Sequence, residues 1–272
     1  MTRLTVVGSV NEDVTLFTDV LPAPGQTVLA SSLRRDPGGK GGNQAAAAAR
    51  LGAECRLIAA VGEDDAGNRM LADLRDAGVD VGAVQRVAVP TGEAHIVVDA
   101  TGENAIVVAA GANAEVTLPG TLDGAVLAQL ECPPAVVQQA ASMTDGFFAL
   151  NASPVVPLPA ALAERCDLVV VNETEYAAMP ELRGARLVVV TLGARGAIAL
   201  ERSREVARVA AVPTRVVSSV GAGDAFCAAA VLGIVEGASV LDALRAACLV
   251  GAAAVASPTA RPLLRPLGEY LR

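Results

Sequence analysis

Residues 168–191 read LVVVNETEYAAMPELRGARLVVVT, with a short apolar run at each end of the stretch. The two runs, Leu168–Val171 and Leu187–Thr191, have the length of strands. A strand without polar alternation is covered on both faces, which is typical of a parallel sheet between two layers of helices. The stretch therefore predicts an α/β fold, a three-layer αβα arrangement around a mostly parallel central sheet.

The same alternation of strands and helices extends to both sides of this stretch. Further buried strands are expected at Leu4–Val7, Arg56–Val61, Val126–Leu130 and Phe147–Leu150. Helices are expected at Gly41–Leu51, Asn68–Ala77, Pro134–Ala141, Ala222–Val235 and Leu241–Ala256. Strands that alternate with helices in this way support the parallel sheet.

One region has a different texture. Ala83–Ala110 consists of short strand-like runs separated by turns, and Thr27–Ser32 is a further candidate strand. Around His95, polar and apolar residues alternate as in a strand with one solvated face. We expect a small antiparallel layer beside the main body, with His95 structural or exposed on it.

Composition excludes several classes of function. The 272 residues carry a net charge of −8 and only 2% aromatic residues, which argues against binding of duplex or single-stranded nucleic acid. The five cysteines lie far apart in mostly apolar surroundings, so we expect reduced, mostly buried thiols in a cytoplasmic protein. No signal peptide is evident, and no apolar run is long enough to span a membrane.

Two glycine clusters stand where helices should begin, Gly38–Asn43 and Gly221–Asp224. Exposed N–H groups and the helix dipole make such ends sites for anions, although neither cluster has the spacing of a P-loop or a dinucleotide fingerprint. In the second cluster, Asp224 could take a hydroxyl proton beside an anion hole, as phosphoryl transfer requires. The alternatives are an acidic first-turn residue for Asp224 and a glycine-rich turn with a solvated Lys40 for the first cluster.

Polar residues also follow several of the expected strands. Asn11 and Asp13 come after the first strand, where open α/β sheets bind ligands, but turn chemistry would explain them equally well. Glu131 follows another strand, where a lone carboxylate is usually just solvated. Asn172–Glu175 ends a further strand and would also fit a helix cap with acidic first-turn residues.

The ordered set of motifs resembles the ribokinase-like (pfkB) sugar kinases from Val6 to Pro262. The stretches similar to the family's signatures are Gly8–Asp13, Pro24–Thr27, Gly38–Ala45, Val61–Gly67, Gly111–Asn113, Gln129–Glu131, Asn172–Glu175, Thr191–Gly196 and Gly221–Asp224. Each motif is weak alone, but together and in this order they are specific.

The resemblance implies roles for individual residues. It implies that the sugar hydroxyls are held by Asn11, Asp13, Gly39, Lys40, Asn43 and Glu131. It implies that Asp224 is the catalytic base and also contacts the sugar, and that the anion hole consists of Gly221, Ala222 and Gly223. The nucleotide site would consist of Asn172, Thr191, Gly193, Arg195, Gly196 and Gly223. Glu175 would organise Mg²⁺, through water.

The resemblance also implies an architecture and an activity. The main α/β domain would comprise residues 1–10, 35–82 and 112–272, with a small β lid formed by 11–34 and 83–111. Such a lid excludes water from the site and often makes a homodimer interface. The expected activity is ATP-dependent phosphorylation of D-ribose at its 5-hydroxyl. The alternatives are a kinase for another furanose or a nucleoside, and a catalytically weak sugar-binding homologue.

Several positions depart from the family pattern. Ser218 stands where the family often has an aspartate that helps to hold K⁺, so a monovalent cation site at Ser218 and Val220 is doubtful. The loop that usually reads G-A-x-P-S reads Thr259-Ala-Arg-Pro-Leu263. Cys248 replaces a polar residue common near adenine, and the segment between Glu175 and Leu187 is too short for the usual helix. We expect weak or absent activation by K⁺.

Overall fold

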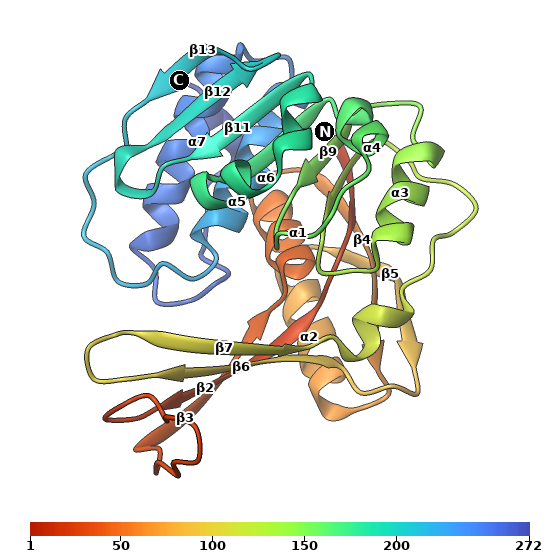
Figure 1. Ribbon diagram of the computed structural model, residues 1–272. Coiled ribbons are helices and arrows are strands. Elements are labelled where there is room, and N and C mark those ends of the chain that lie inside the picture. Colours follow the sequence, from red (N-terminus) through yellow and green to blue (C-terminus); the bar gives the residue numbers. More distant parts are fainter.

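The computed structural model describes residues 1–272 and is built around one large sheet (Figure 1). Its strands lie in the order β13-β12-β11-β10-β9-β8-β1-β4-β5, and β12 alone runs antiparallel to the others. The strands are β1 (Arg3–Val7), β4 (Glu54–Gly62), β5 (Asp80–Val87), β8 (Ala125–Gln129), β9 (Phe148–Asn151), β10 (Leu168–Asn172), β11 (Leu187–Thr191), β12 (Ala197–Glu201) and β13 (Arg204–Val209). The predicted mostly parallel sheet is confirmed.

Helices cover both faces of this sheet. One layer consists of α1 (Lys40–Arg50), α2 (Asp65–Asp76), α6 (Ala222–Val235) and α7 (Val240–Val255). The other consists of α3 (Pro134–Met143), α4 (Ala160–Arg165) and α5 (Glu173–Ala178). Short 3₁₀ turns are η1 (Gly111–Glu115), η2 (Pro180–Gly184), η3 (Gly193–Arg195) and η4 (Leu267–Glu269).

The continuous apolar runs supply two separate cores. In β10, Leu168 and Val170 pack in the core beneath α6 and α7, whereas Val169 and Val171 pack in the core on the opposite face. The residues of β11 divide in the same way. Because successive side chains of a strand point to opposite faces, a strand covered on both sides must be apolar throughout. The three-layer αβα prediction is therefore confirmed.

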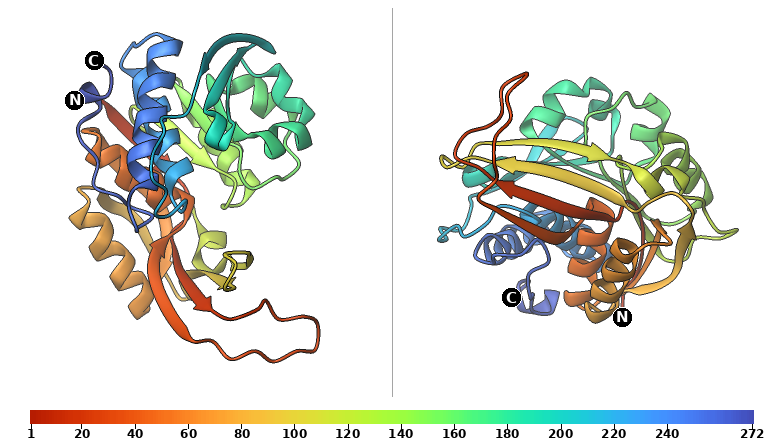
Figure 2. Two further views of the ribbon diagram at one scale, coloured as in Figure 1. Left: turned by 90° about the vertical axis from the view of Figure 1, so that its left-hand side faces the viewer. Right: turned by 90° about the horizontal axis from the view of Figure 1, so that it is seen from below.

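A second sheet of four strands projects from one end of the body and forms the lid (Figures 1 and 2). Its order is β3 (Ser32–Gly38), β2 (Asn11–Phe17), β6 (Gly92–Val98) and β7 (Asn104–Ala109). The predicted antiparallel layer needs one correction, because the central pair, β2 and β6, is parallel. This pairing follows from the long connection between the two strands, which contains α1 and α2.

Two strands cross the expected domain limits. β3 extends to Gly38, beyond residue 34, and β5 pairs with β4 in the large sheet although the lid was expected from residue 83. β5 is a partly exposed edge strand, so its residues resemble those of a half-solvated lid strand. The strand expected at Thr27–Ser32 is wrong. β3 begins only at Ser32, because Ser32 pairs with Phe17, the last residue of β2, and the residues before Ser32 have no strand to pair with.

An ion-pair cluster joins the lid to the body. Glu12 on β2 is 1% exposed and accepts hydrogen bonds from two arginines. Arg69 of α2 donates through Nε and Nη2 at 3.0 and 2.7 Å, and Arg35 of β3 donates to the other carboxylate oxygen. Since a charge-assisted bond is strong when its carboxylate is shielded from water, this cluster fixes the base of the lid against α2.

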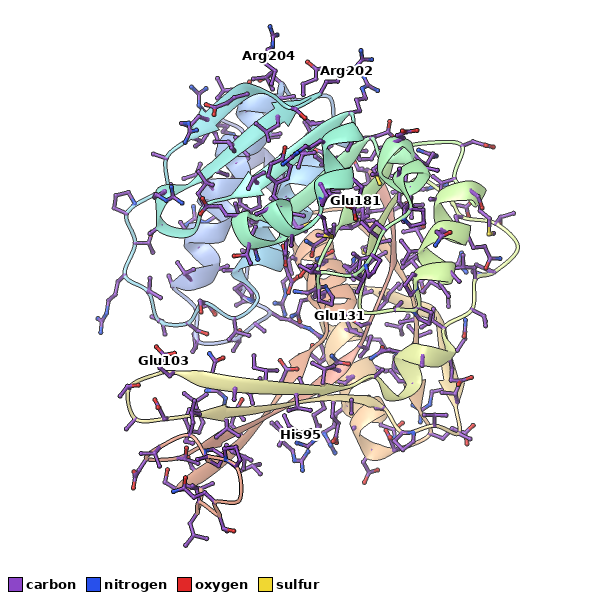
Figure 3. All side chains as sticks on the ribbon, in the orientation of Figure 1. His95, Glu103, Glu131, Glu181, Arg202 and Arg204 are labelled. Atoms are coloured by element: carbon purple, nitrogen blue, oxygen red, sulfur yellow. The ribbon has the colours of Figure 1, made fainter.

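Other expectations from the sequence concern single residues. All five cysteines are buried free thiols, as expected. His95 is exposed on the lid and contacts Glu93 through Nε2 at 2.9 Å, which confirms the structural interpretation (Figure 3). None of the helices combines the length and the apolar character needed to cross a bilayer.

Candidate active site

Most of the candidate residues meet at the carboxyl edge of the large sheet. Asn11 follows β1, Glu131 follows β8, and Asn172 and Thr191 end β10 and β11. The amino-terminal ends of α1 and α6 bring Lys40 and the Gly221–Asp224 cluster to the same edge. Parallel strands place such residues together because their carboxyl ends share one edge, where open α/β sheets bind ligands.

Asp224 lies in the first turn of α6 and is buried. Its Oδ2 accepts a hydrogen bond from Asn43 Nδ2 at 3.1 Å, and its Oδ1 accepts one from Gln44 Nε2 at 3.0 Å. Burial raises the pKa of this carboxyl, whereas Lys40 and the two amide donors lower it. A buried carboxylate with a raised pKa and an open face on a cavity is suited to act as a general base.

The backbone before Asp224 requires glycine. Gly221 has φ +76°, and a Cβ at this position would collide with the carbonyl oxygen of Ala260. This left-handed residue turns the chain into α6, so that the first N–H groups of the helix face the site. Gly39 has φ +81° and makes the corresponding turn into α1, where a Cβ would lie 2.7 Å from the nitrogen of Asn11. At α1, Glu131 and Ser9 already accept hydrogen bonds from the first N–H groups, so the helix end that stays open to an anionic ligand is that of α6.

Lys40 and Glu131 face each other across the site. Glu131 Oε2 accepts a hydrogen bond from the backbone N–H of Lys40 at 2.9 Å and another from the Ser9 hydroxyl. Burial lowers the pKa of the Lys40 ammonium, but Asp224 and Glu131 outweigh it and raise the pKa above its usual value. Lys40 is therefore a partly buried cation that lines the same cavity as the candidate base, and it is not a fully solvated lysine.

The remaining sugar-site candidates lie where the lid meets the body. Asn11 is buried, and its Oδ1 accepts a hydrogen bond from Asn113 Nδ2 at 2.7 Å. Asp13 packs against Gly38, where a Cβ would collide with its carboxylate. Burial and the nearby charge of Glu131 raise the pKa of Asp13 to about 7. These interactions are tertiary and replace the simple turn chemistry that the sequence left open.

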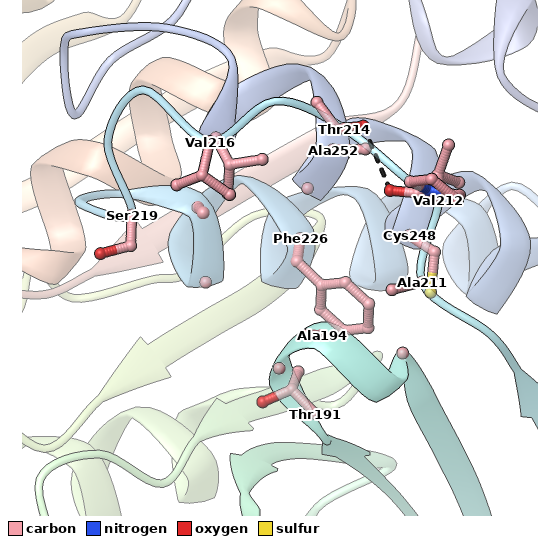
Figure 4. Close-up of a pocket in the computed structure, with 17 residues that line it drawn as sticks. Thr191, Ala194, Ala211, Val212, Thr214, Val216, Ser219, Phe226, Cys248 and Ala252 are labelled. Carbon is pink, nitrogen blue, oxygen red and sulfur yellow. Dashed lines mark hydrogen bonds between the residues drawn. The ribbon is translucent and has the colours of Figure 1, made fainter.

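Two adjoining cavities open on this edge. The larger has a volume of about 640 Å³ and is mostly apolar, with Phe226 and Cys248 in its wall (Figure 4). The smaller has a volume of about 230 Å³ and is lined mostly by polar residues, including Lys40 and Asp224. Three residues line both cavities: Thr191, Ser219 and Gly223. A ligand that occupied both would pass directly over the amino-terminal end of α6.

The predicted nucleotide residues divide between these cavities. Those lining the larger one are Thr191, Gly193, Gly196 and Gly223, whereas Asn172 lines the smaller one. Arg195 lines neither and instead forms an ion pair with Glu173 on the surface. Its role at the nucleotide therefore stays a prediction, and it would require the exposed guanidinium to exchange Glu173 for the nucleotide.

Asn172 and Glu175 also form a capping box. Asn172 Oδ1 accepts a hydrogen bond from the N–H of Glu175 at 2.9 Å, and Glu175 Oε2 accepts one from the N–H of Asn172 at 2.8 Å. The capping interpretation is thus confirmed, yet both residues line the smaller cavity with Asp224. Glu175 keeps one carboxylate oxygen free of the cap. A carboxylate near a phosphate site fits Mg²⁺, which is held by one or two carboxylates and several waters.

The doubtful monovalent site lies on the loop before α6. Ser218 is partly exposed, Val220 is 45% exposed, and the Ser218 hydroxyl accepts a hydrogen bond from the Val220 N–H at 3.3 Å. The structure contains no group of three or more His, Cys, Asp or Glu side chains that could hold a metal ion. Because Ser218 contributes no negative charge to balance a cation at this loop, no step is assigned to K⁺.

Sequence reasoning missed four polar residues behind the site. Gln44, Gln129, Asn151 and Arg261 are each less than 10% exposed, and together with Asn43 they form the network that surrounds Asp224. Gln44 and Gln129 lie in the motif stretches Gly38–Ala45 and Gln129–Glu131. A polar residue beside an apolar strand or helix is a local signal that could have assigned them to the site. Arg261 lies in the Thr259–Leu263 loop that departs from the family pattern, but its contact with Asn43 joins residues 218 positions apart, which no local pattern reveals.

The site places a buried aspartate at a helix end between two adjoining cavities, an arrangement suited to phosphoryl transfer between two small molecules. The profile of the family described as pfkB family carbohydrate kinase matches residues 1–265. The ribokinase of Bacillus subtilis is 34% identical over 265 residues, covering 90% of this chain and 90% of that protein.

Solved structures agree with this similarity. The ribokinase of Thermotoga maritima superposes with a TM-score of 0.89 at 26% identity, covering 99% of this chain and 98% of that chain. The ribokinase of Arabidopsis thaliana, complexed with ribose and ATP, has a TM-score of 0.89 at 28% identity, covering 100% and 99%. The chain belongs to the pfkB family of carbohydrate kinases.

Proposed function

We propose that the protein transfers the γ-phosphoryl group of ATP to the 5-hydroxyl of D-ribose, which yields ribose 5-phosphate and ADP. The observation that carries this proposal is the position of Asp224. Its buried carboxylate lines the polar cavity, and the neighbouring Gly223 lines both cavities. The similarity to ribokinases, one of them bound to ribose and ATP, supports the choice of sugar and donor.

In this mechanism Asp224 takes the proton from the attacking hydroxyl. The oxygen of the sugar attacks the γ-phosphorus, while the bond between the γ-phosphorus and the bridging oxygen breaks and that oxygen leaves with ADP. Because burial raises the pKa of Asp224, the carboxylate is a stronger base than one in water, while Lys40 and the amide donors favour its ionised form. The hydroxyl has to reach Asp224 from the side of the cavity, since the amides of Asn43 and Gln44 occupy the other side.

The negative charge of the transferred group is held by the end of α6. The N–H group of Gly223 follows the left-handed Gly221 and has no partner within the protein, whereas the N–H group of Ala222 makes a 3.3 Å hydrogen bond to the carbonyl oxygen of Ser219. Such preorganised donors, added to the dipole of the fourteen-residue helix, stabilise charge that develops in the transition state. Lys40 adds a cation on the same side of the smaller cavity.

The sugar lies between the lid and the body in this proposal. Asn11, Asp13 and Asn43 offer amide and carboxylate groups for the hydroxyls, and the backbone of Gly39 approaches closely because it carries no side chain. Glu131 completes the polar wall and is tied to Lys40. The lid, residues 11–34 and 83–111 with the corrected strand limits, closes the site and excludes water that would otherwise receive the phosphoryl group.

The larger cavity takes the adenosine moiety of ATP. Phe226 and Cys248 offer an apolar surface to the base, and Gly193 and Gly196 let the chain come close to it. Glu175 and Asn172 face the phosphates in the smaller cavity. Mg²⁺, held there by Glu175 through water, would neutralise phosphate charge when bound.

Assembly and compartment belong to the same proposal. β7 is an edge strand whose six residues are all exposed, among them Ile106, Val107 and Val108. An exposed apolar edge strand is a template for pairing with another chain, so we infer a homodimer formed through the lids. Five unpaired buried thiols support a reducing compartment, as in the cytoplasm.

The test compares turnover with binding in an Asp224→Asn variant. ADP release with Mg-ATP is measured for a panel of D-ribose, 2-deoxy-D-ribose, D-fructose and adenosine, and ribose binding is measured by calorimetry. We expect ribose to be preferred, and the variant to lose at least about a hundredfold in kcat while it keeps ribose binding. Turnover of the variant at the wild-type rate would refute the role of Asp224, and a preference for adenosine would refute the choice of acceptor.

A further inference from the structure

The two amides that hold Asp224 must each point in one direction. Asn43 and Gln44 are neighbours in α1, and their NH₂ groups donate to different oxygens of the carboxylate, at 3.1 and 3.0 Å. An amide turned by 180° would place its carbonyl oxygen against a carboxylate oxygen instead. The hydrogen bond would then be replaced by repulsion. The electrostatics of Asp224 therefore depend on whatever holds the far ends of these amides.

Arg261 holds the far end of Asn43. Its Nε donates to Asn43 Oδ1 at 3.1 Å, and since a guanidinium has no acceptor it can bond only to the carbonyl end of the amide. The guanidinium is itself fixed by two other segments. Its Nη1 pairs with the carboxylate of Asp73 in α2, and its Nη2 donates to the carbonyl oxygen of Gly38 at 3.1 Å. The side chain of Arg261 is only 3% exposed.

Gln129 holds the far end of Gln44 in the same manner. Its Nε2 donates to Gln44 Oε1 at 2.6 Å from the end of β8, and the residue is fully buried. Gln44 Nε2 also donates to Asn151 Oδ1 at 2.9 Å, so both of its hydrogens and its oxygen have partners. In contrast, Gln129 Oε1 is buried without any partner. A buried polar atom without a partner costs free energy. Gln129 nevertheless keeps this orientation because it points its NH₂ group at Gln44 Oε1, whereas the opposite orientation would place two carbonyl oxygens against each other.

We propose that Arg261 and Gln129 are positioning residues for the catalytic base: each locks the orientation of one amide, so that both oxygens of Asp224 face a donor. Neither residue lines the two cavities. The proposal rests on the proposed role of Asp224. Asn43 and Gln44 contact the carboxylate directly. Arg261, in the loop after α7, and Gln129, at the end of β8, contact these two amides from behind.

The expected consequence is a change in the pH profile. When Arg261 or Gln129 is removed, the amide that it orients no longer donates reliably to Asp224. The pKa of Asp224 then rises, so the acidic limb of kcat moves to higher pH. The charged groups that face Asp224 from other elements are Lys40, Glu131 and Asp13, and a variant of Gln129 leaves all three in place. A residue that only supported packing would lower thermal stability and reduce kcat equally at every pH.

The experiment measures kcat against pH from 5.5 to 9.5 for wild type, Gln129→Met, Arg261→Met and a control, Asp73→Asn. Methionine matches the length of Gln129 and is shorter than Arg261, and at both positions it removes the donor. The control weakens the ion pair of Arg261 and leaves its Nε bond to Asn43. We expect the acidic limb to rise by about half a unit to one unit in both methionine variants, with the control at the wild-type position.

Four results would decide the matter. A shifted limb in Gln129→Met with kcat restored at pH 9 would support the proposal, even if Arg261→Met did not fold. An unshifted limb in a folded Gln129→Met protein that binds ribose would overturn it. If Asp224→Asn keeps full turnover, the proposed base itself is wrong. If that variant is inactive while the methionine variants keep the wild-type profile, only the positioning role fails.

Discussion

The raised pKa of Asp13 predicts that binding of ribose depends on pH in the neutral range. Burial and the charge of Glu131 raise this pKa to about 7 in the sugar-free protein, and the carboxylates of Asp36 and Asp224 contribute in the same direction. The charge of Arg261 acts in the opposite direction and lowers the pKa. If the ionised carboxylate accepts hydrogen bonds from sugar hydroxyls, only the ionised form binds well.

The size of the effect follows from the titration. With a pKa of about 7, Asp13 is about one tenth ionised at pH 6 and about nine tenths ionised at pH 8. Since the apparent Kd is the intrinsic Kd divided by the competent fraction, ribose should bind about tenfold more weakly at pH 6 than at pH 8. Binding at pH 6 should also release nearly one proton, whereas binding at pH 8 should release almost none.

Isothermal titration calorimetry measures both quantities. The chain has no tryptophan, so calorimetry is preferable to intrinsic fluorescence. Titrations in buffers of different ionisation enthalpy give the number of protons released, and Asp13→Asn serves as the control that should bind weakly and without pH dependence. A Kd that stays constant from pH 6 to 8 in wild type would refute the reasoning, as would a pH dependence that survives in Asp13→Asn.

The same pKa has a consequence for stability. The folded protein holds the Asp13 proton up to about pH 7, whereas the unfolded chain loses it near 3.8. Between these values the folded state binds more protons, so its free energy of unfolding falls as pH rises, and above about pH 7 this contribution stays constant. Asp13→Asn removes this loss. The Tm of the variant should exceed that of wild type by more at pH 8 than at pH 5.

Further variants test the other parts of the site. Gly221→Ala places a Cβ against Ala260 and should lower kcat by about a hundredfold while ribose binding persists, which steady-state kinetics and calorimetry distinguish. Glu12→Gln loosens the ion-pair cluster at the base of the lid, so KM for ribose should rise and the protein should lose about 1–3 kcal/mol of stability in urea unfolding. Cys248→Trp fills the larger cavity and should raise KM for ATP at least about tenfold with ribose binding unchanged. Replacement of K⁺ by choline should change kcat by less than about twofold, because Ser218 provides no carboxylate; a steep rise with K⁺ would contradict this.

Much of the fold was predictable because its strands carry an unambiguous signal. The runs in β10 and β11 are apolar on both faces, and only a sheet covered on both sides satisfies them. β5 was less predictable because an exposed edge strand alternates as a lid strand does. The start of β3 depended on the register with β2, a long-range property that local composition does not contain.

The candidate site divides in a similar way. Asp224 and the glycines before it could be found from their order along the chain, since a turn with positive φ before a helix leaves a local pattern. The contact of Arg261 with Asn43 could not be found, because it arises only when the loop after α7 folds onto α1. The ion pair between Arg195 and Glu173 is likewise a tertiary contact.

The most direct test of the proposed activity is the identity of the product. The purified protein is incubated with Mg-ATP and D-ribose, and the phosphorylated sugar is analysed by ³¹P and ¹³C NMR, with a reaction lacking ribose as control. The proposed geometry predicts one phosphate, on the 5-hydroxyl, formed in equal amount to ADP and only when ribose is present. Phosphate on another hydroxyl, or ADP released at the same rate without ribose, would contradict it.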